Sequence, residues 1–310
     1  MNPEILCFGE ALWDLLPDGP VLGGAPLNLA YRLDAQGLRA GIISSLGKDK
    51  LGTDAWNLIG HYGMDRSFLF SHEELATGTV LVELDETGEP SYTIVKDAAY
   101  DSIPLTGELL EASASALCFC FGTLAQRDKR SRETLKALLA NRGDGFNLLD
   151  LNLRPDCYDD ESISYSLNHA SVLKINEEEA RSLKDWYSFK ETDYRELAAA
   201  LCRRFNLQYC IITLGPRGAC VASSDGPICH EPSYDVPRVD PCGAGDAFTA
   251  GFLSIYLGGG YVTEACRRGN ALGSAVTSRR GAIQNIPAKE VEMLEKEGIP
   301  YQFKDSDFLV

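Results

Sequence analysis

A turn of small residues followed by an acidic residue carries the clearest chemical signal in the sequence. The turn consists of Gly243, Ala244 and Gly245, and Asp246 follows it at the start of an apolar segment over residues 247–252. The backbone N–H groups of such a turn can point into one space, and a helix N-terminus adds about half a positive elementary charge there. An anion site beside a carboxylate suits phosphoryl transfer to a hydroxyl, because the carboxylate can accept the hydroxyl proton. The alternative is a capped helix whose aspartate only complements the helix dipole.

Polar positions near the N-terminus indicate a second part of the same site. Gly24 belongs to a pair of glycines that allows close backbone approach to a ligand, and Asn28 offers hydrogen-bond donors and an acceptor. A simple Gly-Pro turn is the alternative interpretation. Asp14 lies inside an otherwise apolar segment, where burying a carboxylate without a partner is costly. We therefore expect Asp14 to face a polar ligand or a pocket, and an edge strand facing water is the competing interpretation.

Two further motifs follow apolar runs in the second half of the chain. Thr213, Gly215 and Gly218 close one run, and turns at strand ends are where open α/β sheets bind ligands. Asn176 and Glu179 follow another run, and their oxygens could orient the waters of a hydrated Mg²⁺. A lone Asn-x-x-Glu is, however, more often a helix cap. The sequence contains no Walker motif and no Gly-x-Gly-x-x-Gly after its first apolar run, so P-loop and dinucleotide-binding enzymes lose their main support.

The elements that must position these residues alternate along the chain. Short apolar runs predict buried strands at residues 5–9, 40–46, 116–121, 146–149, 172–175 and 209–214. Helical spacing predicts helices at residues 29–36, 53–62, 131–140, 177–186 and 193–205. This alternation favours an α/β fold with a mostly parallel central sheet and helices on both faces. A hairpin over residues 79–84 and 92–95, with its turn at 85–88, does not fit the alternation and is expected to be an inserted β-sheet lid.

Composition excludes several classes of partner. The chain has 310 residues with 29 Lys and Arg against 45 Asp and Glu, a net charge of -16, so it lacks the basic face of a nucleic-acid binder. No signal peptide and no membrane-spanning apolar run are evident, and the ten cysteines form no Cys-x-x-Cys pair. We expect a cytoplasmic protein with reduced thiols and no membrane contact. We also expect one domain over residues 1–310, with a lid subdomain from about residues 12–22 and 77–97.

Two motifs together give a resemblance to a known family. They are Gly23-Gly24-Ala25-Pro26-x-Asn28-x-Ala30 and the turn from Gly243 to Asp246, which stand in the right order more than 200 residues apart. The chain resembles the PfkB (ribokinase-like) carbohydrate kinases from about residue 5 to residue 288. The resemblance implies a ribokinase-like fold, ATP and Mg²⁺ as cofactors, and a sugar as the second substrate.

The resemblance also implies a role for each matching position. Asp246 would be the catalytic base, and the N–H groups of Gly243, Ala244 and Gly245 would form the anion hole. The sugar would be held by Asp14, Gly24, Asn28 and Arg154. The nucleotide would be held by Asn176, Thr213, Gly215, Gly218 and Asn270, with Glu179 acting on Mg²⁺ through water. Asp240 and Gly281 would bind a monovalent cation such as K⁺, although Pro241 stands where many members have threonine.

Several alternatives stay open about the substrate and the assembly. The segments 98–101, 122–127 and 150–154 make the chain most similar to bacterial fructokinases. Arg154 could instead hold the carboxylate of an acid sugar, as in a 2-keto-3-deoxygluconate kinase, and a ribokinase-type or nucleoside kinase is a third option. A sugar-binding regulator without catalysis is the alternative from another class. The lid sheet could also carry a homodimer contact.

Overall fold

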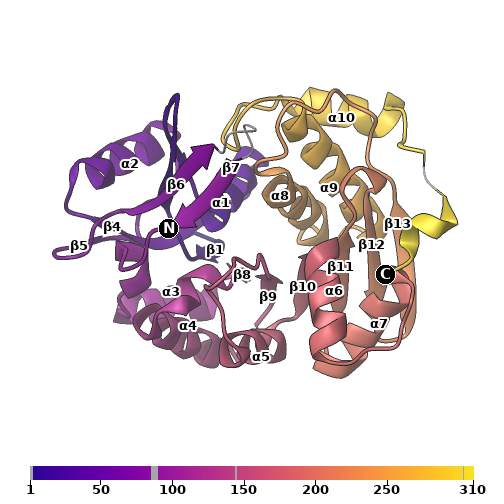
Figure 1. Ribbon diagram of the computed structural model, residues 1–310, viewed down its shortest axis with the longest axis horizontal. Coiled ribbons are helices and arrows are strands. Elements are labelled where there is room, and N and C mark those ends of the chain that lie inside the picture. Colours follow the sequence, from indigo (N-terminus) through magenta and orange to yellow (C-terminus); the bar gives the residue numbers. More distant parts are fainter. Residues whose placement is uncertain (1–2, 85–89, 144, 303) are drawn as a thin grey trace.

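Two β-sheets organise the chain, a large one through the body of the molecule and a small one beside it (Figure 1). The structure is a computed structural model and describes residues 3–84, 90–143, 145–302 and 304–310. In these residues the large sheet has the strand order β13-β12-β11-β10-β9-β8-β1-β4-β5. Its strands are β1 (Ile5–Phe8), β4 (Ala40–Gly47), β5 (Leu69–His72), β8 (Cys118–Phe121), β9 (Asn147–Asp150), β10 (Val172–Asn176), β11 (Tyr209–Thr213), β12 (Ala219–Ser223) and β13 (Gly226–Glu231). Among the described strands of this sheet, only the pairs that β12 makes with β11 and β13 are antiparallel, so the predicted mostly parallel sheet is confirmed.

Helices cover both faces of the large sheet, because its central strands are apolar on both sides. In β1, Ile5 and Cys7 belong to the core on one face while Leu6 and Phe8 belong to the core on the other. The helices on the Leu6 face are α3 (Gly107–Ser115), α4 (Lys129–Arg142), α5 (Asp160–His169), α6 (Glu177–Trp186) and α7 (Tyr194–Phe205). Those on the Ile5 face are α1 (Ala25–Ala35), α2 (Lys50–His61), α8 (Ala244–Tyr256), α9 (Val262–Thr277) and α10 (Ala288–Glu297).

Helix α1 begins earlier than the predicted start at residue 29. Pro26 lies in its first turn, where the missing N–H group and the fixed φ of proline are tolerated. Gly24 is therefore the N-cap of α1, and Asn28 lies inside the helix. The interpretation of this segment as a simple Gly-Pro turn is wrong, since the segment is a helix start.

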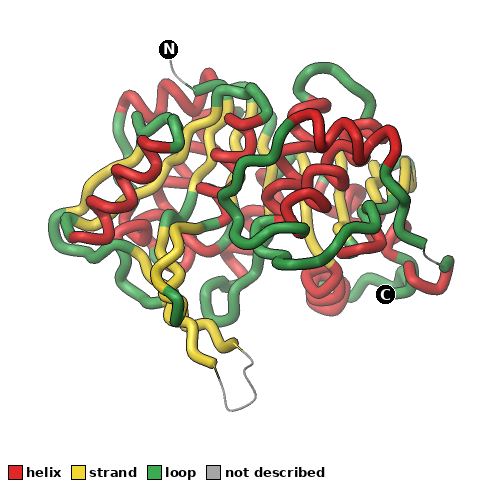
Figure 2. The backbone as a smooth tube through the Cα atoms, turned by 90° about the horizontal axis from the view of Figure 1, so that it is seen from above, coloured by secondary structure: helices red, strands yellow, loops and turns green. Residues whose placement is uncertain are grey.

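The small sheet consists of four strands in the described residues, in the order β3-β2-β6-β7. They are β2 (Leu12–Leu16), β3 (Gly19–Gly23), β6 (Gly78–Leu84) and β7 (Pro90–Ile94). The pairs β2/β3 and β6/β7 are antiparallel, whereas β2 and β6 are parallel, and Figure 2 shows β6 and β7 projecting from the body. The predicted lid sheet is confirmed, and the turn predicted at residues 85–88 lies outside the described residues. Because Asp14 is in the inner strand β2, the interpretation of its segment as an edge strand is wrong.

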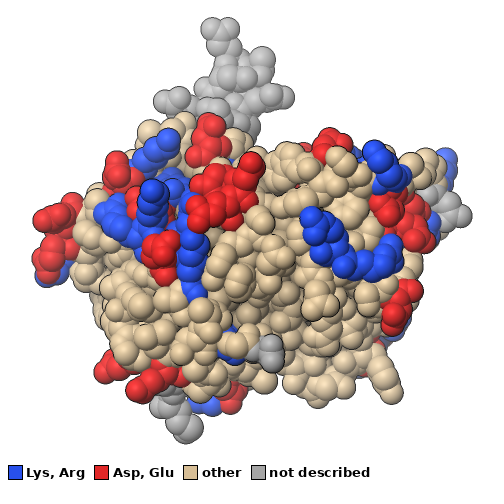
Figure 3. Space-filling view, turned by 90° about the horizontal axis from the view of Figure 1, so that it is seen from below, with Lys and Arg blue, Asp and Glu red and all other residues tan. Residues whose placement is uncertain are grey.

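Charged side chains are mixed on the surface. On the face seen in Figure 3, Lys and Arg side chains lie in small groups among Asp and Glu side chains, without a continuous basic stripe. That face therefore lacks the electrostatic footprint expected for a nucleic-acid backbone. No helix in the described ranges is both long and apolar enough to cross a membrane.

Candidate active site

The turn of small residues before Asp246 forms the start of α8. Gly243 is the N-cap with a φ of 74°, and a Cβ atom there would lie 2.5 Å from the Cβ of Ala282, so glycine is required. Asp246 lies in the first turn of the helix, and its Oδ2 accepts a hydrogen bond of 2.9 Å from Asn28 Nδ2. This bond joins the two sequence motifs directly, although they lie 218 residues apart.

The start of α8 also presents backbone N–H groups to an anion, since the first N–H groups of a helix have no partner within it. The Ala244 N–H donates to the Pro241 carbonyl at 3.1 Å, whereas the N–H groups of Gly243 and Gly245 make no such loop bond among the described residues. Of the three N–H groups expected to form an anion hole, that of Ala244 is therefore already engaged in this geometry.

The Asp246 carboxyl titrates in a range that suits proton transfer. Burial raises its pKa to about 6, and the charge of Asp150 adds to the rise. The Asn28 hydrogen bond and the charges of Lys174 and Arg154 act in the opposite direction. A carboxylate whose pKa lies close to the working pH is a suitable general base for a hydroxyl proton.

A buried ion pair beside this turn was missed by the sequence analysis. Lys174 Nζ in β10 lies 3.1 and 3.0 Å from the two carboxylate oxygens of Asp150 in β9. A Cβ atom on Gly245 would lie 2.9 Å from the same Nζ, so the ammonium group adjoins the start of α8. Burial disfavours the charged form of Lys174, but the carboxylates of Asp150, Glu179 and Asp246 outweigh it and raise its pKa. The available signal was a single lysine within the apolar run 172–175.

The residues expected to hold a sugar converge near Asp246. Burial raises the pKa of Asp14, Glu10 and Asp246, and in each case the charge of Arg154 opposes the rise, so these four groups lie close together. Gly24 lies against the same group, since a Cβ atom there would be 2.4 Å from the Glu10 carbonyl oxygen. Glu10 was not recognised in the sequence, where its only signal is an acidic residue directly after the first strand and Gly9.

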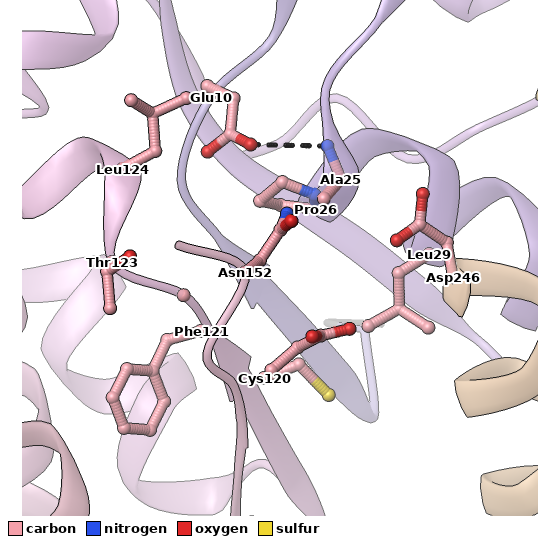
Figure 4. Close-up of a pocket in the computed structure, with 12 residues that line it drawn as sticks. Glu10, Ala25, Pro26, Leu29, Cys120, Phe121, Thr123, Leu124, Asn152 and Asp246 are labelled. Atoms are coloured by element: carbon pink, nitrogen blue, oxygen red, sulfur yellow. Dashed lines mark hydrogen bonds between the residues drawn. The ribbon is translucent and has the colours of Figure 1, made fainter. Parts of the chain in front are cut away.

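A pocket opens beside Asp246 (Figure 4). It is lined by Glu10, Ala25, Pro26, Leu29, Cys120, Phe121, Gly122, Thr123, Leu124, Asp150, Asn152 and Asp246. Apolar walls with a few convergent polar groups are typical of small-molecule sites. Asn28 Oδ1 is buried and has no hydrogen-bond partner among the described residues, so a ligand hydroxyl could satisfy it.

The predicted nucleotide residues lie in two connected groups. Asn176 and Thr213 are paired positions at the ends of the neighbouring parallel strands β10 and β11. Gly218 has a φ of 89°, and a Cβ atom there would lie 2.0 Å from the Glu231 carbonyl oxygen. Asn270 in α9 donates to that same carbonyl oxygen at 2.7 Å. The turn after β11 and Asn270 of α9 thus meet at the end of β13.

Asn176 and Glu179 form a capping box at the start of α6, as the helix-cap alternative predicts. The Glu179 carboxylate accepts the N–H groups of Leu153 and Asn176, both at 2.8 Å, and Asn176 Oδ1 accepts the Glu179 N–H at 3.0 Å. In the described part of the chain, no group of three or more His, Cys, Asp or Glu side chains is arranged to hold a metal ion. The nearby carboxylates of Asp150 and Glu179 therefore fit Mg²⁺ only as a hydrated ion, which is how nucleotide-bound Mg²⁺ is commonly held.

Asp240 and Gly281, the predicted monovalent-cation residues, are in direct contact. Asp240 Oδ2 accepts the Gly281 N–H at 2.9 Å, and Asp240 Oδ1 accepts the Cys242 N–H at 2.9 Å. The carboxylate thereby ties the loop after α9 to the turn before α8. A role for these residues in cation binding stays a prediction.

Comparison with known proteins identifies the family. The pfkB family of carbohydrate kinases matches residues 20–289. The chain belongs to this family. The fructokinase of Escherichia coli is 29% identical over 313 residues, which span 96% of this chain and 100% of that protein. The predicted enzyme class, a carbohydrate kinase, is confirmed.

Solved structures confirm the predicted ribokinase-like fold. The fructokinase of Xylella fastidiosa with bound ATP aligns with a TM-score of 0.81 at 22% identity, covering 94% of this chain and 98% of that chain. The fructokinase of Vibrio cholerae O395, in a form with bound fructose, ADP and calcium ion, aligns with a TM-score of 0.77 at 25% identity. That alignment covers 90% of this chain and 94% of that chain.

The titration of Asp246 predicts an acid limit on activity. A catalytic base at Asp246 would accept a proton only when it is ionised, so kcat/KM for the sugar should fall as the pH drops through about 6. Initial rates between pH 5 and pH 9, with ATP held saturating, measure this fall in kcat/KM. A profile that stays flat down to pH 5 would contradict the pKa derived from the burial of Asp246.

Proposed function

We propose that the chain is an ATP-dependent fructokinase, which transfers the terminal phosphoryl group of MgATP to the hydroxymethyl oxygen of fructose. The Asp246–Asn28 hydrogen bond carries this proposal, because it joins the family's two motifs at the start of α8. The Escherichia coli relative is a fructokinase and the Vibrio cholerae fructokinase binds fructose, and both facts support fructose as the acceptor.

The chemistry follows from the groups around Asp246. Its carboxylate takes the proton of the acceptor hydroxyl as the oxygen attacks phosphorus, and ADP leaves on the opposite side. The N–H groups at the start of α8, and the buried charge of Lys174 beside Gly245, stabilise the negative charge on the transferring group. Bound Mg²⁺ would neutralise the charge of the ATP phosphates. Donors fixed by the fold need no reorganisation during the reaction.

The charges around the pocket favour a neutral sugar over an acid sugar. Arg154 is the cation expected to bind a substrate carboxylate, yet it lies near the carboxyl groups of Glu10, Asp14 and Asp246. Its positive charge therefore already interacts with three carboxyl groups of the protein. A further carboxylate from a 2-keto-3-deoxy acid would add negative charge to an acidic site, which is unfavourable.

We also propose that residues 1–310 act as one domain in which the small sheet is a lid over the sugar. Asp14 in β2 of this sheet interacts electrostatically with Arg154, and lid closure would exclude water, which competes with the sugar for the phosphoryl group. The small sheet exposes the apolar side chains Leu16, Val21, Leu81 and Tyr92. Exposed apolar side chains on this sheet support a homodimer contact through the lid as a further proposal.

The nucleotide and cation assignments are proposals of the same kind. Contacts among Gly218, Glu231 and Asn270 support an adenine site at the end of β13. The adjacent carboxylates of Asp150 and Glu179 support hydrated Mg²⁺ with the ATP phosphates. The contact between Asp240 and Gly281 supports a K⁺ site, which a comparison of rates in potassium and in tetramethylammonium salts would test.

ADP release with four acceptors in parallel tests the substrate. The acceptors are fructose, 2-keto-3-deoxygluconate, ribose and adenosine, each titrated against saturating MgATP. We expect fructose to have a kcat/KM at least tenfold above those of the other three. Faster turnover of the keto-deoxy acid would show that Arg154 is free to bind a substrate carboxylate, and the fructose proposal would be wrong.

A further inference from the structure

Glu10 is a buried carboxylate that lines the pocket and has no role in the chemistry described above. It follows β1 and is only 5% exposed. Its Oε1 accepts the Ala25 N–H at 3.2 Å, at the start of α1, and in Figure 4 the other carboxylate oxygen points away from this bond. An ionised carboxylate has about four acceptor sites, so the Ala25 bond leaves acceptor capacity in the pocket.

Glu10 and Asp246 lie at different ends of the pocket, with Pro26 and Asn152 between them (Figure 4). A small polar ligand that offers one hydroxyl to Asp246 would therefore extend towards Glu10. Both groups are carboxylates, and the wall around them is largely apolar. Buried polar groups in such a wall orient a ligand and select among similar ligands.

The charges around Glu10 suit contact with a hydroxyl group. Burial raises its pKa to about 7, while its own backbone N–H, the charge of Arg154 and the Ala25 N–H act in the opposite direction. The other titratable groups that act on it or share its pocket are Asp246 of α8, Tyr100 of the 3-10 helix Ala99–Ser102, Asp150 of β9 and Cys120 of β8. Near neutral pH, Glu10 can therefore either accept a hydrogen bond or donate one, and a sugar hydroxyl can complement both states.

We propose that Glu10 binds a sugar hydroxyl remote from the one that receives the phosphoryl group, and so helps to determine which sugars are accepted. The inference rests on the proposed function, since it takes the acceptor hydroxyl to lie at Asp246. Glu10 would then have two partners, the Ala25 N–H through one oxygen and the sugar through the other. The first contact orients the carboxylate for the second.

A thermodynamic cycle that combines the variant Glu10→Gln with monodeoxy analogues of fructose tests this contact. Glutamine keeps a carbonyl oxygen for the Ala25 N–H but loses the charge and one acceptor oxygen. We expect kcat/KM for fructose to fall about 10- to 100-fold, the range for a hydrogen bond to a charged group, with KM for ATP unchanged. With the wild type, one of the monodeoxyfructoses should have a kcat/KM that is lower than that of fructose by a similar factor. With Glu10→Gln, the kcat/KM values of that analogue and of fructose should differ by less than about threefold. Glu161→Gln, a change at an exposed carboxylate on α5, is the matched control.

The outcomes separate sugar binding from a purely structural role. If Glu10 only holds the start of α1, Glu10→Gln should have the same kcat/KM values as the wild type. Glu10→Ala should then lower kcat/KM by the same factor for every sugar. That pattern would overturn the proposal. If Glu10→Gln does not fold, the cycle is run with Glu10→Asp, which keeps the charge but retracts the carboxylate. If the wild type does not phosphorylate fructose, the proposed function is wrong. The same cycle is then measured with the sugar that the protein does phosphorylate and with its monodeoxy analogues, and that result decides the role of Glu10.

Discussion

Replacing Asp246 with asparagine should lower kcat by about 10²- to 10⁴-fold, the range for removal of a general base. Asparagine can still bond to Asn28 after a rotation of one amide group, so the start of α8 should persist. It cannot accept the hydroxyl proton. Steady-state rates with fructose and MgATP measure the loss, and Asp54→Asn, at an exposed ion pair on α2, is the matched control.

The same variant should unfold at a higher temperature than the wild type at pH 8. The pKa of Asp246 is raised on folding, so the folded protein binds this proton more tightly than the unfolded chain. The ionised carboxylate therefore reduces stability as the pH rises from about 4 to 6, and the reduction is complete above pH 6. A loss of activity with a gain in melting temperature would mark a residue kept for catalysis. Turnover near that of the wild type would contradict the base assignment.

Replacing Lys174 with methionine should cost about 3–5 kcal/mol of folding free energy, because it leaves the Asp150 carboxylate without its partner in a buried site. It should also raise the pKa of Asp246, which the Lys174 charge lowers, and so move the acid limb of kcat/KM to higher pH. Denaturant titrations and the pH profile measure the two effects.

The double variant Asp150→Asn/Lys174→Met provides the control for Lys174. Removing both partners of a buried pair costs less than removing one, so this variant should recover part of the lost stability. Lys50→Met, at an ion pair whose lysine side chain is 85% exposed, should change stability by less than about 1 kcal/mol. If Lys174→Met were as mild as Lys50→Met, the pair would not be buried as the structure has it.

Six strands of the large sheet (β1, β4, β8, β9, β10 and β11) were predictable because they are buried on both faces. A run such as residues 209–214 is apolar at almost every position, so no partner is needed to recognise it. Helices α3, α5 and α9 and strands β5, β12 and β13 were missed, since their sequences mix small or polar residues with apolar ones and depend on packing against the sheet. The start of α1 was placed too late, because Pro26 suggests a turn unless its place in the first helical turn is considered.

Some residues of the candidate site were predicted from the sequence and others were missed. Asp246 and Asn28 were identified from the small residues around them, since only small residues let a backbone approach a ligand. The contact between Lys174 and Asp150 depends on the register of β9 against β10, where the two residues are paired, and a single sequence does not reveal register. Glu10 was missed for a related reason, because its partner Ala25 belongs to another element.

Transfer of a labelled terminal phosphate from ATP tests the central claim most directly. The purified chain is incubated with the labelled ATP, Mg²⁺ and fructose, and the products are separated and their phosphate positions assigned by nuclear magnetic resonance. The account predicts that the label appears in a fructose phosphate ester at the hydroxymethyl oxygen, and that Asp246→Asn forms this product about 10²- to 10⁴-fold more slowly. Label found only in inorganic phosphate, or only in an ester of another acceptor present at equal concentration, would contradict it.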